Sequence, residues 1–180
     1  VVECLRSGWL AGFGPKSIEF EEKIAKHFGK KYGVFVNSGS SACLLALACL
    51  KLPKGAKVLT PACTFSTTLA PIIQLGLVPV FVDVDLNTYV ANVEEILAAI
   101  TEEVKALMIP NLIGNKPDWK AIKEGLAAMG REDIILIEDS ADTVTYTSET
   151  DIATTSFYAS HVITAGGSGG MVMFNDEKLR

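Results

Sequence analysis

The stretch Ile134–Asp139, with the sequence IILIED, is the most apolar predicted strand of the chain, and it decides the fold. Its apolar residues show no period-two alternation, so both faces of the strand are expected to be buried. Amphipathic helical patterns lie on either side of it in the sequence. A fully buried strand between helices is typical of a parallel sheet in an α/β protein.

Working outward, the same alternation of apolar strands and helices runs along the chain. Strands are predicted at 33–36, 56–59, 79–85, 105–110, 134–139, 154–159 and 170–174. Helices are predicted at 17–28, ending at Gly29, at 42–50, 65–75 and 93–100, and from the N-cap Asp118 to about 129. This order indicates a three-layer αβα fold with a mainly parallel sheet.

Composition excludes several classes of protein. Of the 180 residues, 49% are hydrophobic and 21% are charged, so we expect a folded domain and not a disordered chain. The net charge of −5 argues against nucleic-acid binding, which needs a basic face. No apolar run reaches the ~20 residues that span a bilayer, and the first residues do not resemble a signal peptide. We therefore expect a cytoplasmic protein with no membrane partner.

The four cysteines are expected to be free thiols. Cys4, Cys43, Cys49 and Cys63 contain no CxxC pair, which excludes a disulfide scaffold and leaves no obvious zinc site. Cys43, Cys49 and Cys63 lie in apolar contexts, so we expect them to be buried. We predict no metal ligands.

The turn Asn37–Ser41 follows a predicted strand and opens a helix. The start of a helix exposes unpaired N–H groups and a positive dipole end, which suit a phosphate. Serines are also favoured at ordinary helix N-caps, so this pattern alone leaves both interpretations open.

Two carboxylates, Glu138 and Asp139, end the most apolar strand. Ligands of open α/β sheets bind at the carboxyl ends of strands. A carboxylate there could hold a ribose hydroxyl, a metal or a cationic ring nitrogen, or it could only cap the next segment.

The glycine run 166–170 and the two histidines are weaker signals. The glycines precede a strand instead of a helix, which argues against a dinucleotide fingerprint and leaves a flexible turn or a close backbone approach. His27 is expected at the surface. His161 follows a buried strand, and it could be catalytic or only structural.

In this order the segments resemble the DegT/DnrJ/EryC1/StrS sugar aminotransferase family, which has the type I fold of pyridoxal-phosphate enzymes. The match covers nearly the whole chain, and several co-linear motifs carry it. They are Ser7–Leu10 with Gly12, Gly14-Pro15 and Phe20-Glu21, then Val36–Ala42, Thr60–Phe65, Gly76–Asp85, Ile137–Asp139 and Ser156–Tyr158.

The resemblance implies roles for individual residues. Four positions match residues that bind the cofactor phosphate: Gly39, Ser40, Ser41 and Ser156. Phe65 matches the aromatic residue that stacks on the pyridine ring. Asp139 matches the carboxylate that pairs with the ring nitrogen and keeps it protonated, so that the ring accepts electrons.

His161 stands where aminotransferases of the family have the lysine that bonds to the cofactor aldehyde. No lysine occurs between Lys123 and Lys178. Histidine cannot form that bond stably, yet it can move a proton near neutral pH. Together with Asp142, where aminotransferases commonly have glutamine, this resembles the branch of nucleotide-sugar 4-keto-6-deoxyhexose 3-dehydrases.

The resemblance to that branch implies pyridoxamine phosphate as the working cofactor, with pyridoxal phosphate as its other form. The expected reaction is C3 deoxygenation of a nucleotide-linked 4-keto-6-deoxyhexose, with His161 and Asp139 as catalytic residues, in deoxysugar and lipopolysaccharide biosynthesis. Two alternatives stay open: a nucleotide-sugar aminotransferase, and a non-catalytic relative with a binding or regulatory role.

The resemblance also implies partners and further chain. We expect residues 1–180 to be the large cofactor domain, with the small domain outside these residues. A homodimer with a shared active site is expected. Some members of the branch use an iron–sulfur cluster and a reductase and others use glutamate, and the sequence does not decide between them. The stretch Tyr146–Asp151 looks shorter than the corresponding loop of the family.

Overall fold

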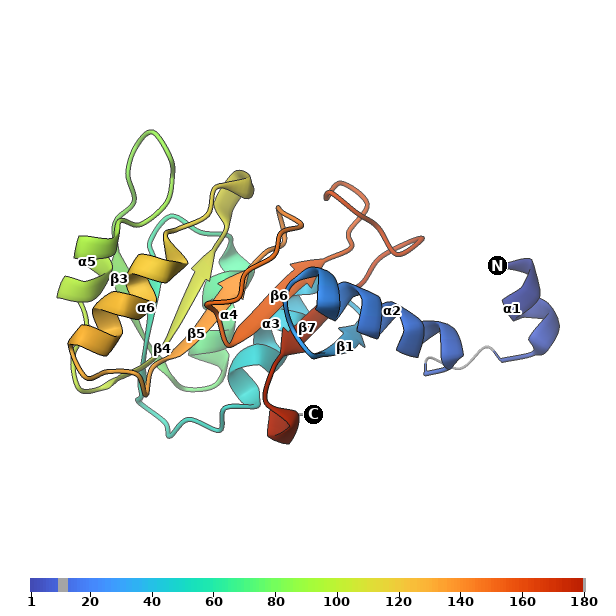
Figure 1. The fold of residues 1–180 in the computed structure, drawn as a ribbon, viewed down its shortest axis with the longest axis horizontal. Helices are drawn as coiled ribbons and strands as arrows, with labels where there is room; N and C mark the ends of the chain where they lie inside the picture. Colours follow the sequence, from blue (N-terminus) through green and yellow to red (C-terminus); the bar gives the residue numbers. More distant parts are fainter. Residues whose placement is uncertain (10–12, 180) are drawn as a thin grey trace.

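The computed structural model describes residues 1–9 and 13–179, which form a sheet with helices on both faces (Figure 1). The strands are β1 (Tyr32–Val36), β2 (Lys57–Pro61), β3 (Val78–Val82), β4 (Val104–Pro110), β5 (Ile135–Asp139), β6 (Ile152–Ser156) and β7 (Gly170–Phe174). The α-helices are α1 (Val2–Ser7), α2 (Pro15–His27), α3 (Gly39–Ala48), α4 (Ser66–Gln74), α5 (Val93–Ala98) and α6 (Trp119–Ala128). Two 3₁₀ turns, η1 (Leu112–Gly114) and η2 (Glu177–Leu179), complete the described elements.

The strand order in the sheet is β1-β7-β6-β5-β4-β2-β3. The five strands from β6 to β3 in this order pair in parallel, and β7 is antiparallel to both of its neighbours. A parallel neighbour needs a crossover connection, usually a helix, whereas the segment 157–169 between β6 and β7 contains no helix. The predicted mainly parallel sheet is confirmed, with β7 as the exception.

The helices divide the core into two faces. The α3 and α4 helices pack on one face, where Met108 of β4 and Ile137 of β5 point. The α5 and α6 helices pack on the other face against Leu107 and Leu136, and α2 packs on that face against β1 and β7. Successive strand residues point to opposite faces, so the sheet is buried on both, as its apolar strands predict.

The start of α3 differs from the expectation in a way that matters for the site. The helix begins at Gly39, three residues before the predicted start, because the Ser38 hydroxyl accepts the Ser41 N–H and caps the helix at 3.1 Å. The predicted cap of α6 is confirmed, since the Asp118 carboxylate accepts the Ala121 N–H at 2.9 Å. The short helix α1 was not predicted, because six residues carry too little periodicity.

The four cysteines are free, as predicted, but their burial is not as expected. Cys43 is buried and Cys49 is partly buried. The expectation of a buried Cys63 is wrong: the residue is exposed, because it lies in the turn between β2 and α4 and not in either element. Two residues of the resemblance, Leu10 and Gly12, lie outside the described residues.

Of the helices that the structure describes, none is long and apolar enough to cross a membrane.

Candidate active site

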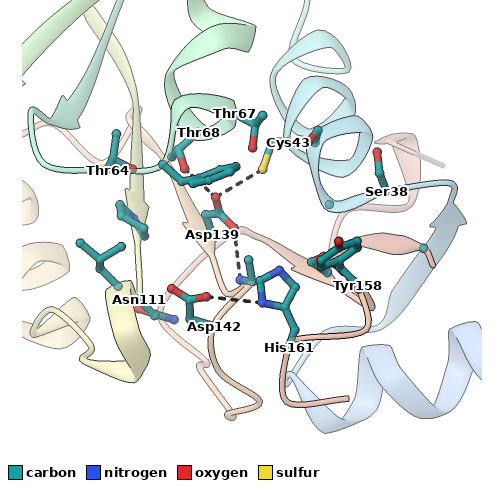
Figure 2. A pocket seen from close by; sticks show the side chains of 18 of the residues that line it. Ser38, Cys43, Thr64, Thr67, Thr68, Asn111, Asp139, Asp142, Tyr158 and His161 are labelled. Carbon is teal, nitrogen blue, oxygen red and sulfur yellow. Dashed lines mark hydrogen bonds and ion pairs between the residues drawn. The ribbon is translucent and has the colours of Figure 1, made fainter. Parts of the chain in front are cut away.

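A cavity of about 620 Å³ opens at the carboxyl ends of the parallel strands, where ligands of open α/β sheets bind (Figure 2). It lies between the first turns of α3 and α4 and the segments that follow β4, β5 and β6. Seven of the eight predicted site residues line it: Gly39, Ser40, Phe65, Asp139, Asp142, Ser156 and His161. Segments far apart in the sequence therefore meet in one cavity.

The start of α3 forms one end of the cavity. The N–H groups of Gly39 and Ser40 precede the first intrahelical hydrogen bond, and neither has a partner within the described residues. Two unpaired N–H groups at the positive end of a ten-residue helix suit an anion. Ser41 is the predicted residue that does not line the cavity, and its hydroxyl lies 3.1 Å from the Ser38 hydroxyl.

Ser156, at the end of β6, faces this turn closely. A Cβ atom at position 39 would lie 2.8 Å from the Cβ of Ser156, so glycine is needed for the approach. The Ser156 hydroxyl accepts the Tyr158 N–H at 3.3 Å, which leaves its own O–H free to donate. A side chain at Gly170 would overlap the backbone of Ser38. Gly170, the last glycine of the run, thus allows a close approach to the protein's own backbone.

Asp139 lies at the centre of the cavity wall, surrounded by hydrogen-bond donors (Figure 2). Its Oδ2 accepts the Thr68 hydroxyl at 2.8 Å and the Cys43 thiol at 3.5 Å. Its Oδ1 accepts the Ala141 N–H at 3.2 Å and the Thr154 hydroxyl at 3.4 Å. Each carboxylate oxygen therefore has two donors.

No cation accompanies these donors, because none of the ion pairs among the described residues includes Asp139. Burial raises the pKa of the Asp139 carboxyl, and the hydrogen bonds, that of Thr68 first, act against this rise. A cation brought into the cavity beside Asp139 would act in the same direction as these hydrogen bonds: it would lower the pKa of Asp139 and favour the carboxylate. The site thus fits a ligand with an anionic group at α3 and a cationic group at Asp139.

Glu138 points to the opposite face of β5 and away from the cavity. It is fully buried, and its Oε1 lies 3.9 Å from the Lys30 ammonium. Its carboxylate also accepts the Asn111 amide at 2.9 Å and the Thr150 hydroxyl at 3.0 Å. Of the two adjacent carboxylates, only Asp139 is available to a ligand in the cavity.

His161 lies across the cavity from the start of α4, with its imidazole beside Asp142 (Figure 2). The His161 Nδ1 is 3.5 Å from Oδ1 of Asp142. A carboxylate at this distance favours a proton on Nδ1 and leaves the Nε2 lone pair for another proton. Among the described residues that line the cavity, none is a lysine. His161 can therefore transfer a proton here, and no lysine side chain competes with it.

Phe65 is an exposed aromatic residue that lines the cavity as the N-cap of α4. Its side chain is 67% exposed, which is unusual for a phenylalanine and leaves a ring face for a planar ligand. Tyr158 lines the cavity as well and is also exposed.

Several lining residues were missed from the sequence. Thr68 and Cys43 were missed although they contact Asp139, because each reads as an ordinary residue of a buried helix face. Thr64 also lines the cavity, and its buried hydroxyl has no hydrogen-bond partner within the described residues. The available signal was their place near Phe65: Thr64 directly precedes it in the chain, and Thr68 lies near the start of α4.

Comparisons with known proteins agree with the expected family. The model of the DegT/DnrJ/EryC1/StrS aminotransferase family matches residues 1–180. The dTDP-4-dehydro-2,6-dideoxy-D-glucose 3-dehydratase of Saccharopolyspora spinosa is 41% identical over 182 residues, which cover 92% of this chain and 38% of that protein. GDP-perosamine synthase of Caulobacter vibrioides is 33% identical over 186 residues, which cover 99% of this chain and 49% of that protein.

A solved structure shows the same fold. The GDP-4-keto-6-deoxy-D-mannose-3-dehydratase of Escherichia coli, with bound hydrated PLP, superposes with a TM-score of 0.88 at 34% identity. The match covers 99% of this chain and 48% of that chain. The present chain therefore spans less than half the length of each of these three proteins.

Proposed function

Because the chain belongs to the DegT/DnrJ/EryC1/StrS aminotransferase family, we propose that residues 1–180 form the cofactor-binding large domain of a pyridoxamine-phosphate-dependent sugar 3-dehydrase. The proposed reaction removes the C3 hydroxyl of a nucleotide-linked 4-keto-6-deoxyhexose. The observation that carries the proposal is His161, which lines the cavity where aminotransferases of the family have a lysine. Two of the compared relatives carry the name 3-dehydratase, which supports it.

The cavity's own residues fit pyridoxamine phosphate. The unpaired N–H groups of Gly39 and Ser40, with the Ser156 hydroxyl, would hold the phosphate. Ser41 would support this turn through Ser38. At the other end, the buried carboxylate of Asp139 lacks a cation and would pair with the protonated ring nitrogen.

When bound, pyridoxamine phosphate supplies the amine that joins the sugar's C4 ketone and a ring that accepts electrons. His161 is the base in this proposal: its Nε2 would accept a proton from the C4′ carbon of the bound cofactor. Asp139 would keep the ring nitrogen charged, and Phe65 would cover the ring face. Together these groups would allow the C3 hydroxyl to leave the sugar with the electron pair of the broken bond.

Asp142 supports His161 in this account. Its carboxylate stands 3.5 Å from Nδ1, so it orients the imidazole and stabilises the positive charge that forms when Nε2 takes a proton. With no lysine in the described cavity wall, no side chain would bond to the cofactor aldehyde and return the enzyme to transamination.

A nucleotide-sugar aminotransferase is the second candidate, because GDP-perosamine synthase is also a relative and matches 99% of the chain. It would transfer an amino group from glutamate to the sugar and keep the C3 oxygen. The third candidate, a non-catalytic relative, would bind the cofactor or sugar without turnover.

The proposed partners follow from the same family. A second copy of the chain would complete the active site, which is consistent with the exposed side chains of Phe65 and Tyr158 in the cavity wall. A nucleotide sugar would be the substrate, in deoxysugar and lipopolysaccharide biosynthesis. An iron–sulfur cluster with a reductase, or glutamate alone, would regenerate the cofactor.

The test uses the full-length protein with pyridoxamine phosphate and either GDP- or dTDP-linked 4-keto-6-deoxyhexose, with and without glutamate. Mass spectrometry of the sugar nucleotide should show loss of the C3 oxygen. The His161→Asn variant should lose turnover by about 100-fold or more, and His27→Asn, which changes an exposed histidine, should not. Amination without C3 deoxygenation would reject the dehydrase, and unchanged turnover of His161→Asn would reject this base.

A further inference from the structure

Asn111 lines the cavity, yet both of its amide hydrogens are used inside the protein. Its Nδ2 donates to Glu138 at 2.9 Å and to the Ser140 hydroxyl at 2.7 Å. Its Oδ1 accepts the Trp119 Nε1–H at 3.3 Å, and because an indole can only donate, this contact fixes which amide atom is oxygen. The side chain is fully buried. It therefore holds protein elements together instead of donating to a ligand.

The backbone of Asn111 is held as well. Its N–H donates to the Asp139 carbonyl at 2.9 Å, and its carbonyl accepts the Gly114 N–H at 3.1 Å. On the far side, Glu138 lies against the buried ammonium of Lys30. Asn111 thus joins the end of β4 to the end of β5 and to a buried ion pair.

The turn that follows Asn111 is strained at a residue that contacts the site. Ile113 has φ 55° and ψ 25°, the left-handed region, which a β-branched side chain rarely adopts. Such a conformation persists only where the surrounding structure holds it. Asn111 holds the start of this turn. At its end, the Asn115 side-chain amide donates a hydrogen bond to the Thr88 carbonyl at 2.8 Å.

The strained turn delivers one hydrogen bond toward the proposed base. The Ile113 N–H donates to Oδ2 of Asp142 at 3.2 Å, while Oδ1 of the same carboxylate faces His161 at 3.5 Å. The Asp142 side chain is therefore held between the turn and the imidazole (Figure 2).

We propose that Asn111 is a positioning residue: it holds the strained turn 111–114 so that the Ile113 N–H keeps Asp142 against Nδ1 of His161. The inference rests on the proposed function for its catalytic consequence. Its structural part, the position of the proton on the His161 ring, can be measured without cofactor or substrate. A failure of the positioning proposal can therefore be distinguished from a failure of the proposed function.

The main test is Asn111→Leu in the full-length protein, which keeps the approximate size and removes the amide. Histidine-selective ¹⁵N NMR reports which ring nitrogen carries the proton, and the His161 signal is assigned by its loss in His161→Asn. We expect a smaller population of the Nδ1–H form in Asn111→Leu. In turnover, kcat should fall roughly 10- to 100-fold with KM nearly unchanged, because the base is misplaced while binding groups stay.

A second variant guards against a folding failure. Trp119→Phe keeps an aromatic ring but removes the indole donor to Asn111 and part of the buried ring volume, and it should shift the His161 tautomer in the same direction by less. The control is Arg131→Met, which removes side-chain bonds to the Thr101 and Val104 carbonyls away from the cavity and should destabilise the fold without a tautomer change. An unchanged His161 tautomer in folded Asn111→Leu overturns the proposal. If Asn111→Leu does not fold and Trp119→Phe does, an unchanged His161 tautomer in Trp119→Phe overturns the proposal.

Discussion

Glu138 and Asp139 are adjacent carboxylates on β5, and the protein treats them in opposite ways. Glu138 faces a closed interior and receives a cation, Lys30, from the protein itself. Asp139 faces the cavity and receives only neutral donors. The charge of Glu138 is paired within the protein, whereas Asp139 is available to a cation that a ligand would bring. The comparison therefore separates a carboxylate that stabilises the fold from one that would bind a ligand.

Removing Lys30, the cation beside Glu138, should have the largest effect on stability. Lys30→Met leaves the Glu138 charge buried without its partner, so we expect the free energy of unfolding to fall by about 3–5 kcal/mol. Denaturant unfolding of the full-length protein measures this. Adding Glu138→Gln to Lys30→Met should recover part of the loss, and a double variant no more stable than Lys30→Met would contradict the role of the pair.

Removing the charge on the cavity side should have a smaller effect, and on binding instead of folding. Asp139→Asn should change the free energy of unfolding by less than about 1 kcal/mol, because a desolvated charge disappears with its hydrogen bonds. Affinity for pyridoxamine phosphate, followed by fluorescence titration, should fall about 10- to 100-fold. Unchanged affinity would mean that Asp139 does not meet the cation.

The donors to Asp139 offer a finer change. Thr68→Val removes the 2.8 Å hydrogen bond and keeps the shape, so we expect a loss of about 1.5 kcal/mol in stability. Cys43→Ala, which removes a longer thiol contact, serves as the weaker comparison and should cost less from hydrogen bonding. Both losses are measured as changes in the free energy of unfolding, and the value for Cys43→Ala is corrected for the cavity that alanine creates. Equal corrected losses in the two variants would contradict this ranking.

The pH dependence of stability should give the smallest effect. Burial raises the pKa of Asp139 above its ordinary value of about 3.8, so the folded protein binds this proton more tightly than the unfolded chain does. The stabilisation is fully present below pH 3.8 and is lost as pH rises through the raised folded value. Relative to Asp139→Asn, the cofactor-free protein should lose stability as the pH rises across this window. Saturating pyridoxamine phosphate should reduce that loss, and a cofactor-independent difference would contradict the pairing.

Local patterns were enough for much of the fold. β7 has the predicted bounds, Asp118 caps α6, and the buried strands form the expected parallel sheet. Seven of the eight site residues that the resemblance singled out line one cavity in the structure.

What could not be predicted depends on distant contacts. By position alone the two carboxylates of β5 look equivalent, and only the resemblance singled out Asp139; which of them faces the cavity depends on the one-residue register of the strand. Lys30 and Asn111 carry no functional signal in the sequence, because their partners lie on other elements. Strain at Ile113 has no signal in the sequence, since a β-branched residue there argues against the observed backbone.

The most direct test of the central claim is release of label from pyridoxamine phosphate that carries deuterium at the C4′ carbon, with the sugar nucleotide present. If His161 is the base, the full-length protein should release deuterium from C4′ to the solvent in step with loss of the C3 oxygen, and His161→Asn should do so at least about 100-fold more slowly. Deuterium release by His161→Asn at the rate of the unaltered protein would contradict the account.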